Sequence, residues 1–279
     1  MYRRFYNLNR YPFELSPDPY FFCATAGHKE VLLNLVYGIQ RRKGFIGVTG
    51  EVGTGKTLLI HCVSELLRRI DAPFAYVNNP HVSSIELIQG LLDQFKLPSR
   101  VTSRSDGLDR LGRFLADQYR RSRTCVLIVD EAQLLSWKML EEIRLLGNLE
   151  TTRQKLLQIV LVGQPELDRR IDSPSCLQLK QRLSLRCRLA PLNEEETKKY
   201  IVGRLELAGA NSTAQHLFTP EALAAIFRYS RGIPRVVNTI SENALIVGYS
   251  CQARCIGLDL IEEVSSGLHL SPPECRVAV

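Results

Sequence analysis

The chain has 279 residues, 45% of them hydrophobic and 23% charged, which excludes wholesale disorder and allows one large domain or two modest ones. No run of 18 apolar residues occurs, so we expect no transmembrane helix. Residues 1–7 include arginines but no apolar segment follows them, so we expect no secretory signal and a cytoplasmic location, peripheral to the inner membrane if partners recruit the protein.

The formal net charge of +7 has two interpretations. Most basic clusters, such as Arg41-Arg42-Lys43 and Arg120-Arg121, end an amphipathic run, where cations favour the helix dipole. The alternative is a surface for nucleic acid or anionic lipid. The pattern favours the first interpretation and leaves the second open.

The eight cysteines are scattered and include no CxxC pair, which indicates free thiols in a reducing compartment. Cys251 and Cys255 are four residues apart and could share a helix face. Without a second pair or a well-placed histidine, they are a weak candidate for a metal site.

Helical and strand patterns alternate through the first two thirds of the chain. The expected helices lie around residues 32–39, 56–69, 108–119 and 140–149, and the expected strands at 45–49, 74–78, 126–129 and 157–162. Strands that are apolar throughout and separated by helices predict an α/β fold with a central parallel sheet buried on both faces.

After Pro191 the pattern is helical only. Asn193 with Glu196, and Thr219-Pro220-Glu221, are typical helix starts, and further helices are expected at 236–249 and 258–268. We therefore expect an α/β nucleotide-binding domain over 1–190 with an aromatic and proline-rich N-terminal segment, a small all-α lid over 191–268, and a flexible tail over 269–279.

Residues 50–57 read GEVGTGKT and match GxxxxGK[ST] between an expected strand and an expected helix, as the P-loop motif requires. Glycines let successive backbone N–H groups point at phosphates, and the helix N-terminus adds partial positive charge. Lys56 would reach the β- and γ-phosphates of ATP, and the Thr57 hydroxyl would ligate Mg²⁺. The predicted nucleotide-binding residues are Gly50, Glu51, Val52, Gly53, Thr54, Gly55, Lys56, Thr57, Leu58 and Arg235.

Asp130 and Glu131 follow the apolar strand 126–129. Asp130 is placed to hold Mg²⁺ through water, and Glu131 to polarise the attacking water. A helix N-cap with a first-turn glutamate is the alternative, but the distance of about 70 residues from a P-loop favours the catalytic interpretation.

Three further polar residues are candidate catalytic groups. Gln164, after the strand 157–162, is a candidate sensor of the attacking water, although Gly163 and Pro165 also suit a plain turn. Arg182, or second Arg186, could reach the γ-phosphate of a neighbouring subunit, where a guanidinium stabilises transition-state charge. Arg235 opens a helix after Gly232-Ile233-Pro234 and could contact the phosphates; an exposed turn arginine is the alternative.

These elements, in this order and followed by a helical lid, resemble an AAA+ ATPase, with Gly232-Ile233-Pro234-Arg235 similar to its sensor 2 motif. Several stretches resemble the ExeA/GspA-type ATPases of the general secretion pathway over about residues 1–265. They are Met1-Tyr2, 11–19, Gly44-Phe45, the P-loop, 130–133, 148–151 and, as the longest, 156–167. The resemblance gives Lys56, Thr57, Asp130, Glu131, Gln164, Arg182 and Arg235 the roles described above, and implies that residues 18–22 and His28 lie near the adenine.

Secretion members of that family continue into a transmembrane helix and a periplasmic peptidoglycan-binding module, whereas this chain stops at Val279. We interpret it as an excised ATPase region or a stand-alone relative.

The resemblance thus implies an ATPase that couples nucleotide state to homo-oligomerisation and to the assembly or remodelling of a protein partner, as in secretion. An ATP-dependent DNA-binding regulator, like the related transposition proteins with an Asp-Glu-Ala-[His/Gln] signature, is the alternative that the basic charge supports. A nucleotide switch without turnover fits Glu131 less well, and a small-molecule kinase fits the Arg235 motif less well.

Overall fold

The computed structural model describes residues 1–78, 82–152, 154–210 and 216–272. Contacts between residues divide the chain into two compact units. The α/β unit comprises Gly27–Glu51 and Leu59–Leu189, and the helical unit comprises Met1–Ala26, Val52–Leu58 and the chain from Ala190 onward. Part of the expected tail 269–279, including Cys275, lies outside the described residues. Within the described ranges, no helix is long and apolar enough to cross a membrane.

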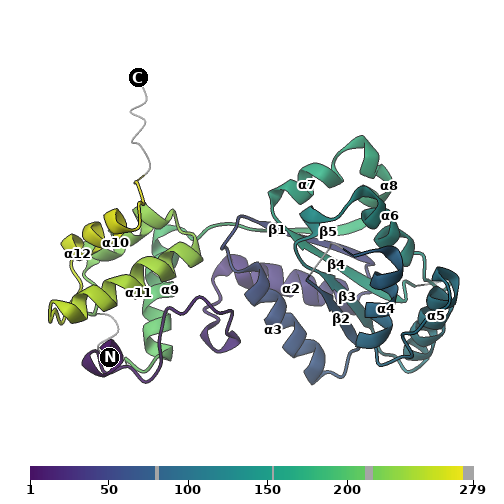
Figure 1. Ribbon diagram of the computed structural model, residues 1–279, viewed down its shortest axis with the longest axis horizontal. Helices are drawn as coiled ribbons and strands as arrows, with labels where there is room; N and C mark the ends of the chain where they lie inside the picture. The colour runs from purple at the N-terminus through teal and green to yellow at the C-terminus, as the bar shows by residue number, and fades with distance from the viewer. Residues whose placement is uncertain (79–81, 153, 211–215, 273–279) are drawn as a thin grey trace. The chain divides into compact units, whose positions relative to one another are not determined.

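The α/β unit contains a parallel five-stranded sheet in the order β2-β3-β4-β1-β5. Its strands are β1 (Phe45–Gly50), β2 (Phe74–Val77), β3 (Cys125–Val129), β4 (Leu157–Gly163) and β5 (Leu183–Leu189). Figure 1 shows the helices packed around this sheet. They are α2 (Ala26–Gln40), α3 (Lys56–Arg69), α4 (Ser84–Gln94), α5 (Arg104–Arg120), α6 (Trp137–Leu146), α7 (Pro165–Ile171) and α8 (Leu177–Lys180), with the 3-10 turns η2 (Ala132–Leu134) and η3 (Pro174–Cys176). The expected parallel sheet is therefore confirmed.

Strands β1, β3 and β4 are buried at every residue, which explains why they are mostly apolar: successive side chains of a strand point to opposite faces, and both faces are covered. Leu127 and Val129 belong to the core cluster that includes residues of α4, α5 and α6. On α2, a Cβ at Gly38 would come within 2.6 Å of Ile46 Cδ1, so glycine allows that helix to approach β1 closely.

Several elements were not expected from the sequence, namely the short helices α1 (Tyr2–Phe5), α7 and α8, the longer helix α4 and the strand β5. Helix α4 begins with a capping box in which Ser83 and Glu86 each accept from the other's backbone N–H. Strand β5 lies at the edge of the sheet, and its more exposed polar residues alternate with less exposed apolar ones. Because it has no continuous apolar run, the sequence did not indicate a strand there.

The helical unit contains α9 (Glu194–Leu207), α10 (Pro220–Ser230), α11 (Pro234–Ser250) and α12 (Leu258–Gly267). The expected caps are confirmed: Asn193 and Glu196 form a capping box, and the Thr219 side chain accepts from Ala222 N.

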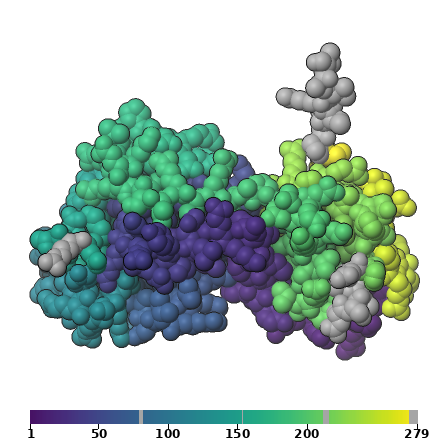
Figure 2. All heavy atoms as spheres, turned by 180° about the vertical axis from the view of Figure 1, so that it is seen from behind, coloured from purple at the N-terminus to yellow at the C-terminus, as the bar shows by residue number. Residues whose placement is uncertain are grey.

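The N-terminal segment, with α1 (Tyr2–Phe5) and the 3-10 turn η1 (Pro19–Phe21), completes the core of the helical unit. The Tyr2 hydroxyl donates to Glu242 at 2.8 Å, and Arg204 Nε donates to Pro12 O at 2.5 Å. Figure 2 shows the first residues in dark purple beside the green helices of this unit. We expected this segment to belong to the α/β domain of residues 1–190. Its aromatic side chains are instead buried in the core that contains residues of α9, α10 and α11.

Candidate nucleotide-binding site

The glycine loop connects β1 directly to α3, as the P-loop motif requires. Gly53 and Gly55 have φ of +81° and +95°, a left-handed backbone that side chains disfavour. Alternation of such residues with right-handed ones turns successive N–H groups to one side, which makes an anion-binding concavity. Lys56 is the first residue of α3 and is only 7% exposed. A backbone of this kind can bind phosphate groups.

Arg235 contacts the glycine loop within the helical unit. Its backbone N–H donates to Gly53 O at 3.2 Å, and a Cβ on Gly53 would lie 2.8 Å from Arg235 Cβ. Arg235 is in the first turn of α11, where Pro234 takes the first position. The structure therefore brings two of the predicted binding elements together, and it gives Gly53 a packing reason besides its φ.

Asp130 follows β3 at the same edge of the sheet as the end of β1, because the strands are parallel. It is 3% exposed, and its carboxylate accepts from the Tyr76 hydroxyl and from Glu131 N, both at 2.9 Å. Burial, together with the Asp130 carboxylate, raises the pKa of Tyr76. The hydroxyl thus stays a donor to Asp130 at neutral pH.

Glu131 is held in a left-handed conformation with φ of +51°, which is strained for a residue with a side chain. Its carboxylate Oε2 accepts from Gln133 Nε2 at 2.6 Å. The same Gln133 amide accepts from the backbone N–H of Gln164 at 3.0 Å. Glu131 and Gln164, both predicted from strand ends, are therefore joined through one residue to which the sequence reasoning gave no role.

Gln164 is the N-cap residue of α7, but its side chain makes no capping bond. Strand β4 lies between β3 and β1 in the sheet, so Gln164 follows the strand between the one ending at Asp130 and the one entering the glycine loop.

Arg182 and Arg186, the two candidates to reach a neighbouring subunit's γ-phosphate, do not lie at the sheet edge where Asp130 and Gln164 lie. Arg182 precedes β5, whose first residue pairs with the first residue of β1, so it lies at the edge opposite the glycine loop. It donates to Asn148 Oδ1 and, at 3.4 Å, to Arg144 O. Arg186, inside β5, forms an ion pair with Asp172 at 3.1 Å. Neither is placed at the phosphate loop of its own chain.

The Thr57 hydroxyl and the Asp130 carboxylate are each oxygen donors of the kind that Mg²⁺ prefers. In the described part of the chain, no group of three or more His, Cys, Asp or Glu could hold a metal ion. Cys251 and Cys255 are exposed free thiols.

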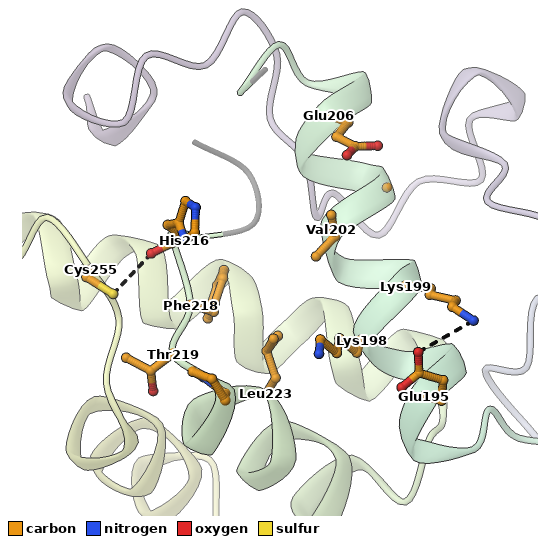
Figure 3. A pocket seen from close by; sticks show the side chains of 12 residues that line it. Glu195, Lys198, Lys199, Val202, Glu206, His216, Phe218, Thr219, Leu223 and Cys255 are labelled. Carbon is orange, nitrogen blue, oxygen red and sulfur yellow. Dashed lines mark hydrogen bonds and ion pairs between the residues drawn. The ribbon is translucent and has the colours of Figure 1, made fainter. Parts of the chain in front are cut away.

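A separate pocket of about 770 Å³ lies in the helical unit (Figure 3). Val202, Phe218 and Leu223 contribute apolar side chains, and the Lys199–Glu195 ion pair of 3.5 Å lies at its side. None of the residues predicted to bind or hydrolyse nucleotide lines it.

Comparisons with known proteins agree with this geometry. Residues 39–171 match the AAA domain family. General secretion pathway protein A of Aeromonas hydrophila is 39% identical over 254 residues, which are 90% of this chain and 45% of that protein. The chain thus spans less than half the length of this relative.

Solved structures share the fold at low identity. Cdc6p of Pyrobaculum aerophilum has a TM-score of 0.68 at 17% identity, with 92% of this chain and 70% of that chain covered. The ORC2 protein of Aeropyrum pernix has a TM-score of 0.65 at 18% identity, with 92% and 71% covered. The sequence match over nearly the whole chain, together with the glycine loop and the parallel sheet, shows that the chain belongs to the AAA ATPases of the general secretion pathway protein A type.

Proposed function

We propose that this protein binds Mg-ATP in the loop Gly50–Leu58 and hydrolyses it. The observation that carries the proposal is the shared sheet edge: β1 enters the glycine loop there, and β3 ends there at Asp130 and Glu131. Phosphoryl transfer to water needs a loop that binds the phosphates and acidic groups that hold the metal and polarise the water.

In this proposal each residue has a separate part. The loop N–H groups and Lys56 bind the phosphates, while Thr57 and Asp130 hold Mg²⁺, which supplies positive charge against the developing negative charge. Glu131 orients and polarises the attacking water, and Gln164 contacts it or the γ-phosphate. Arg235 connects the helical unit to the phosphates, an assignment that its contact with Gly53 supports.

We further propose that turnover requires a homo-oligomer, with Arg182 completing the site of a neighbouring subunit. Support comes from its position at the sheet edge away from its own glycine loop. Arg186 is the weaker candidate because Asp172 already engages its guanidinium.

The name of the relative from Aeromonas hydrophila suggests that the work of hydrolysis is directed at a protein partner of a secretion or envelope system, from the cytoplasmic side. DNA is the alternative partner. The basic clusters support it less than their number suggests, because each contains an arginine with a structural contact. Examples are Arg42 over the Tyr119 ring, Arg121 with Asp117, and Arg170 over the Trp137 ring.

The first test separates binding from chemistry. Lys56→Ala should abolish ATP binding, because it removes the cation at the phosphates, whereas Glu131→Gln should bind ATP like the parent but lose turnover by about 10²-fold or more. Binding is measured with a fluorescent ATP analogue and turnover by phosphate release, with and without duplex DNA. Equal turnover by parent and Glu131→Gln would remove Glu131 from the mechanism, and stimulation by DNA would favour the alternative partner.

A further inference from the structure

The side chain of Gln133 occupies a buried position between two groups of the proposed hydrolytic site. It is 9% exposed and lies on η2, immediately after Glu131 and Ala132. Its Nε2 donates to Glu131 Oε2 at 2.6 Å, and its Oε1 accepts from Gln164 N at 3.0 Å. One amide thus connects the end of β3 with the end of β4.

The chemistry of the two partners fixes the orientation of this amide. The Gln164 backbone N–H can only donate, so it requires the carbonyl oxygen of Gln133. The Glu131 carboxylate, when ionised, can only accept, so it requires the NH₂ group. A flipped amide would oppose donor to donor and acceptor to acceptor. The amide group of Gln133 can therefore form both hydrogen bonds in only one of its two orientations.

The surrounding residues hold the bridge in place from two sides. Arg170 donates to the backbone carbonyls of Gln133 and Leu135 and lies over the Trp137 ring, which fixes η2. Gly163 at the end of β4 leaves room for the amide, because a Cβ there would lie 2.7 Å from Gln133 Oε1. The backbone of Glu131 is itself restricted by its left-handed φ and its bond to Asp130 Oδ1.

We propose that Gln133 is a positioning residue that couples the β4 tip to the carboxylate of Glu131. A shift of the Gln164 backbone when the γ-phosphate is bound or lost would move the amide, and with it the carboxylate that polarises water. This inference rests on the proposed hydrolysis and adds to it a route by which the nucleotide state reaches Glu131.

Three substitutions separate the two halves of the bridge. Gln133→Met keeps the length and removes both hydrogen bonds. Gln133→Glu keeps the acceptor for Gln164 but places a second carboxylate against Glu131. Gln133→His, as a neutral imidazole, retains one donor and one acceptor. Residues that orient the ligands of a metal site typically change activity by about 10- to 100-fold when they are replaced, and we expect an effect of that order here.

We therefore expect kcat to fall about 10- to 100-fold in Gln133→Met and Gln133→Glu, with partial recovery in Gln133→His, while KM and ATP affinity stay within about twofold. A merely structural role would instead change ATP affinity and leave no recovery by histidine. If Glu131→Gln loses turnover but Gln133→Met turns over ATP like the parent, this inference is overturned. The proposed function would then still stand.

Hydrogen exchange at the Gln164 amide gives a readout that does not need turnover. Protection should be lost in Gln133→Met and retained in Gln133→Glu, because only the glutamate keeps an acceptor. Parental protection in Gln133→Met would show that the bridge is not formed, and the coupling would be rejected even if no ATP were hydrolysed.

Discussion

Tyr76 reaches Asp130 from the neighbouring strand and donates its hydroxyl at 2.9 Å, so a proposed metal-binding carboxylate depends on a partner 54 residues away in sequence. Strand β2 was expected from its apolar residues, but this polar role of its tyrosine has no sequence signal. The same holds for Gln133, because the stretch Asp130-Glu131-Ala132-Gln133 gives no indication of its contacts. Strand ends can be predicted from apolar runs; the side chains that connect them cannot.

The raised pKa of Tyr76 predicts a particular dependence of stability on pH. Below the usual tyrosine pKa near 10, the hydroxyl is protonated in both states and its bond to Asp130 stabilises the fold by about 1 kcal/mol. Above that pH the unfolded tyrosine ionises while the folded one resists, so this contribution declines. Tyr76→Phe should therefore melt below the parent at pH 8, and the difference should shrink as pH rises past 10. A difference that grows with pH would contradict the assignment.

At the scale of elements, the helical periods and caps predicted most of the secondary structure. The expected strand 157–162 is β4, Leu157–Gly163, and the expected helix 56–69 is α3. Strand β5 was missed because its charged residues alternate with apolar ones, and the N-terminal segment was grouped with the α/β domain because its aromatic residues show no period. Local patterns identify an element more readily than they identify its packing partner.

The turn between α10 and α11 depends on one glycine. Gly232 has φ of +70°, and a Cβ there would lie 1.8 Å from Leu192 O. Because that contact is with backbone, Gly232→Ala should destabilise the helical unit by roughly 2–4 kcal/mol. Gly267→Ala is the matched control, since an added Cβ meets nothing within 4 Å at the end of α12. Thermal unfolding by circular dichroism compares the two; equal melting temperatures would contradict the role of Gly232.

For the molecule as a whole, the net charge of +7 and the placement of Arg182 lead to different expectations. The basic side chains with described partners mostly serve local structure, so the charge is a weak argument for a nucleic-acid partner. Arg182, in contrast, lies at the edge of the sheet opposite the glycine loop of its own chain. Its proposed contact with the γ-phosphate therefore requires ATP bound to a neighbouring subunit.

Mixed oligomers test that expectation. Arg182→Ala and Glu131→Gln should each be at least about 10²-fold slower than the parent. An equimolar mixture should recover roughly a quarter of the parental rate under random assembly, because an intact Glu131 can meet an intact Arg182 of a neighbour. Asn148→Ala, which removes the side chain that Arg182 contacts within its own chain, should keep turnover and serves as the control. A mixture no faster than its components would place Arg182 outside the site, and Arg186→Ala would then be mixed in its place.

The joining of residues 1–26 to the helices after Ala190 has a consequence for synthesis. During synthesis, Tyr2 is made before its partner Glu242, which follows 240 residues later. Until α11 is made, the aromatic side chains of the first segment have no core to enter, while the sheet between them can already form. The contacts between residues far apart in sequence should therefore close last, and we expect the helical unit to fold after the α/β unit.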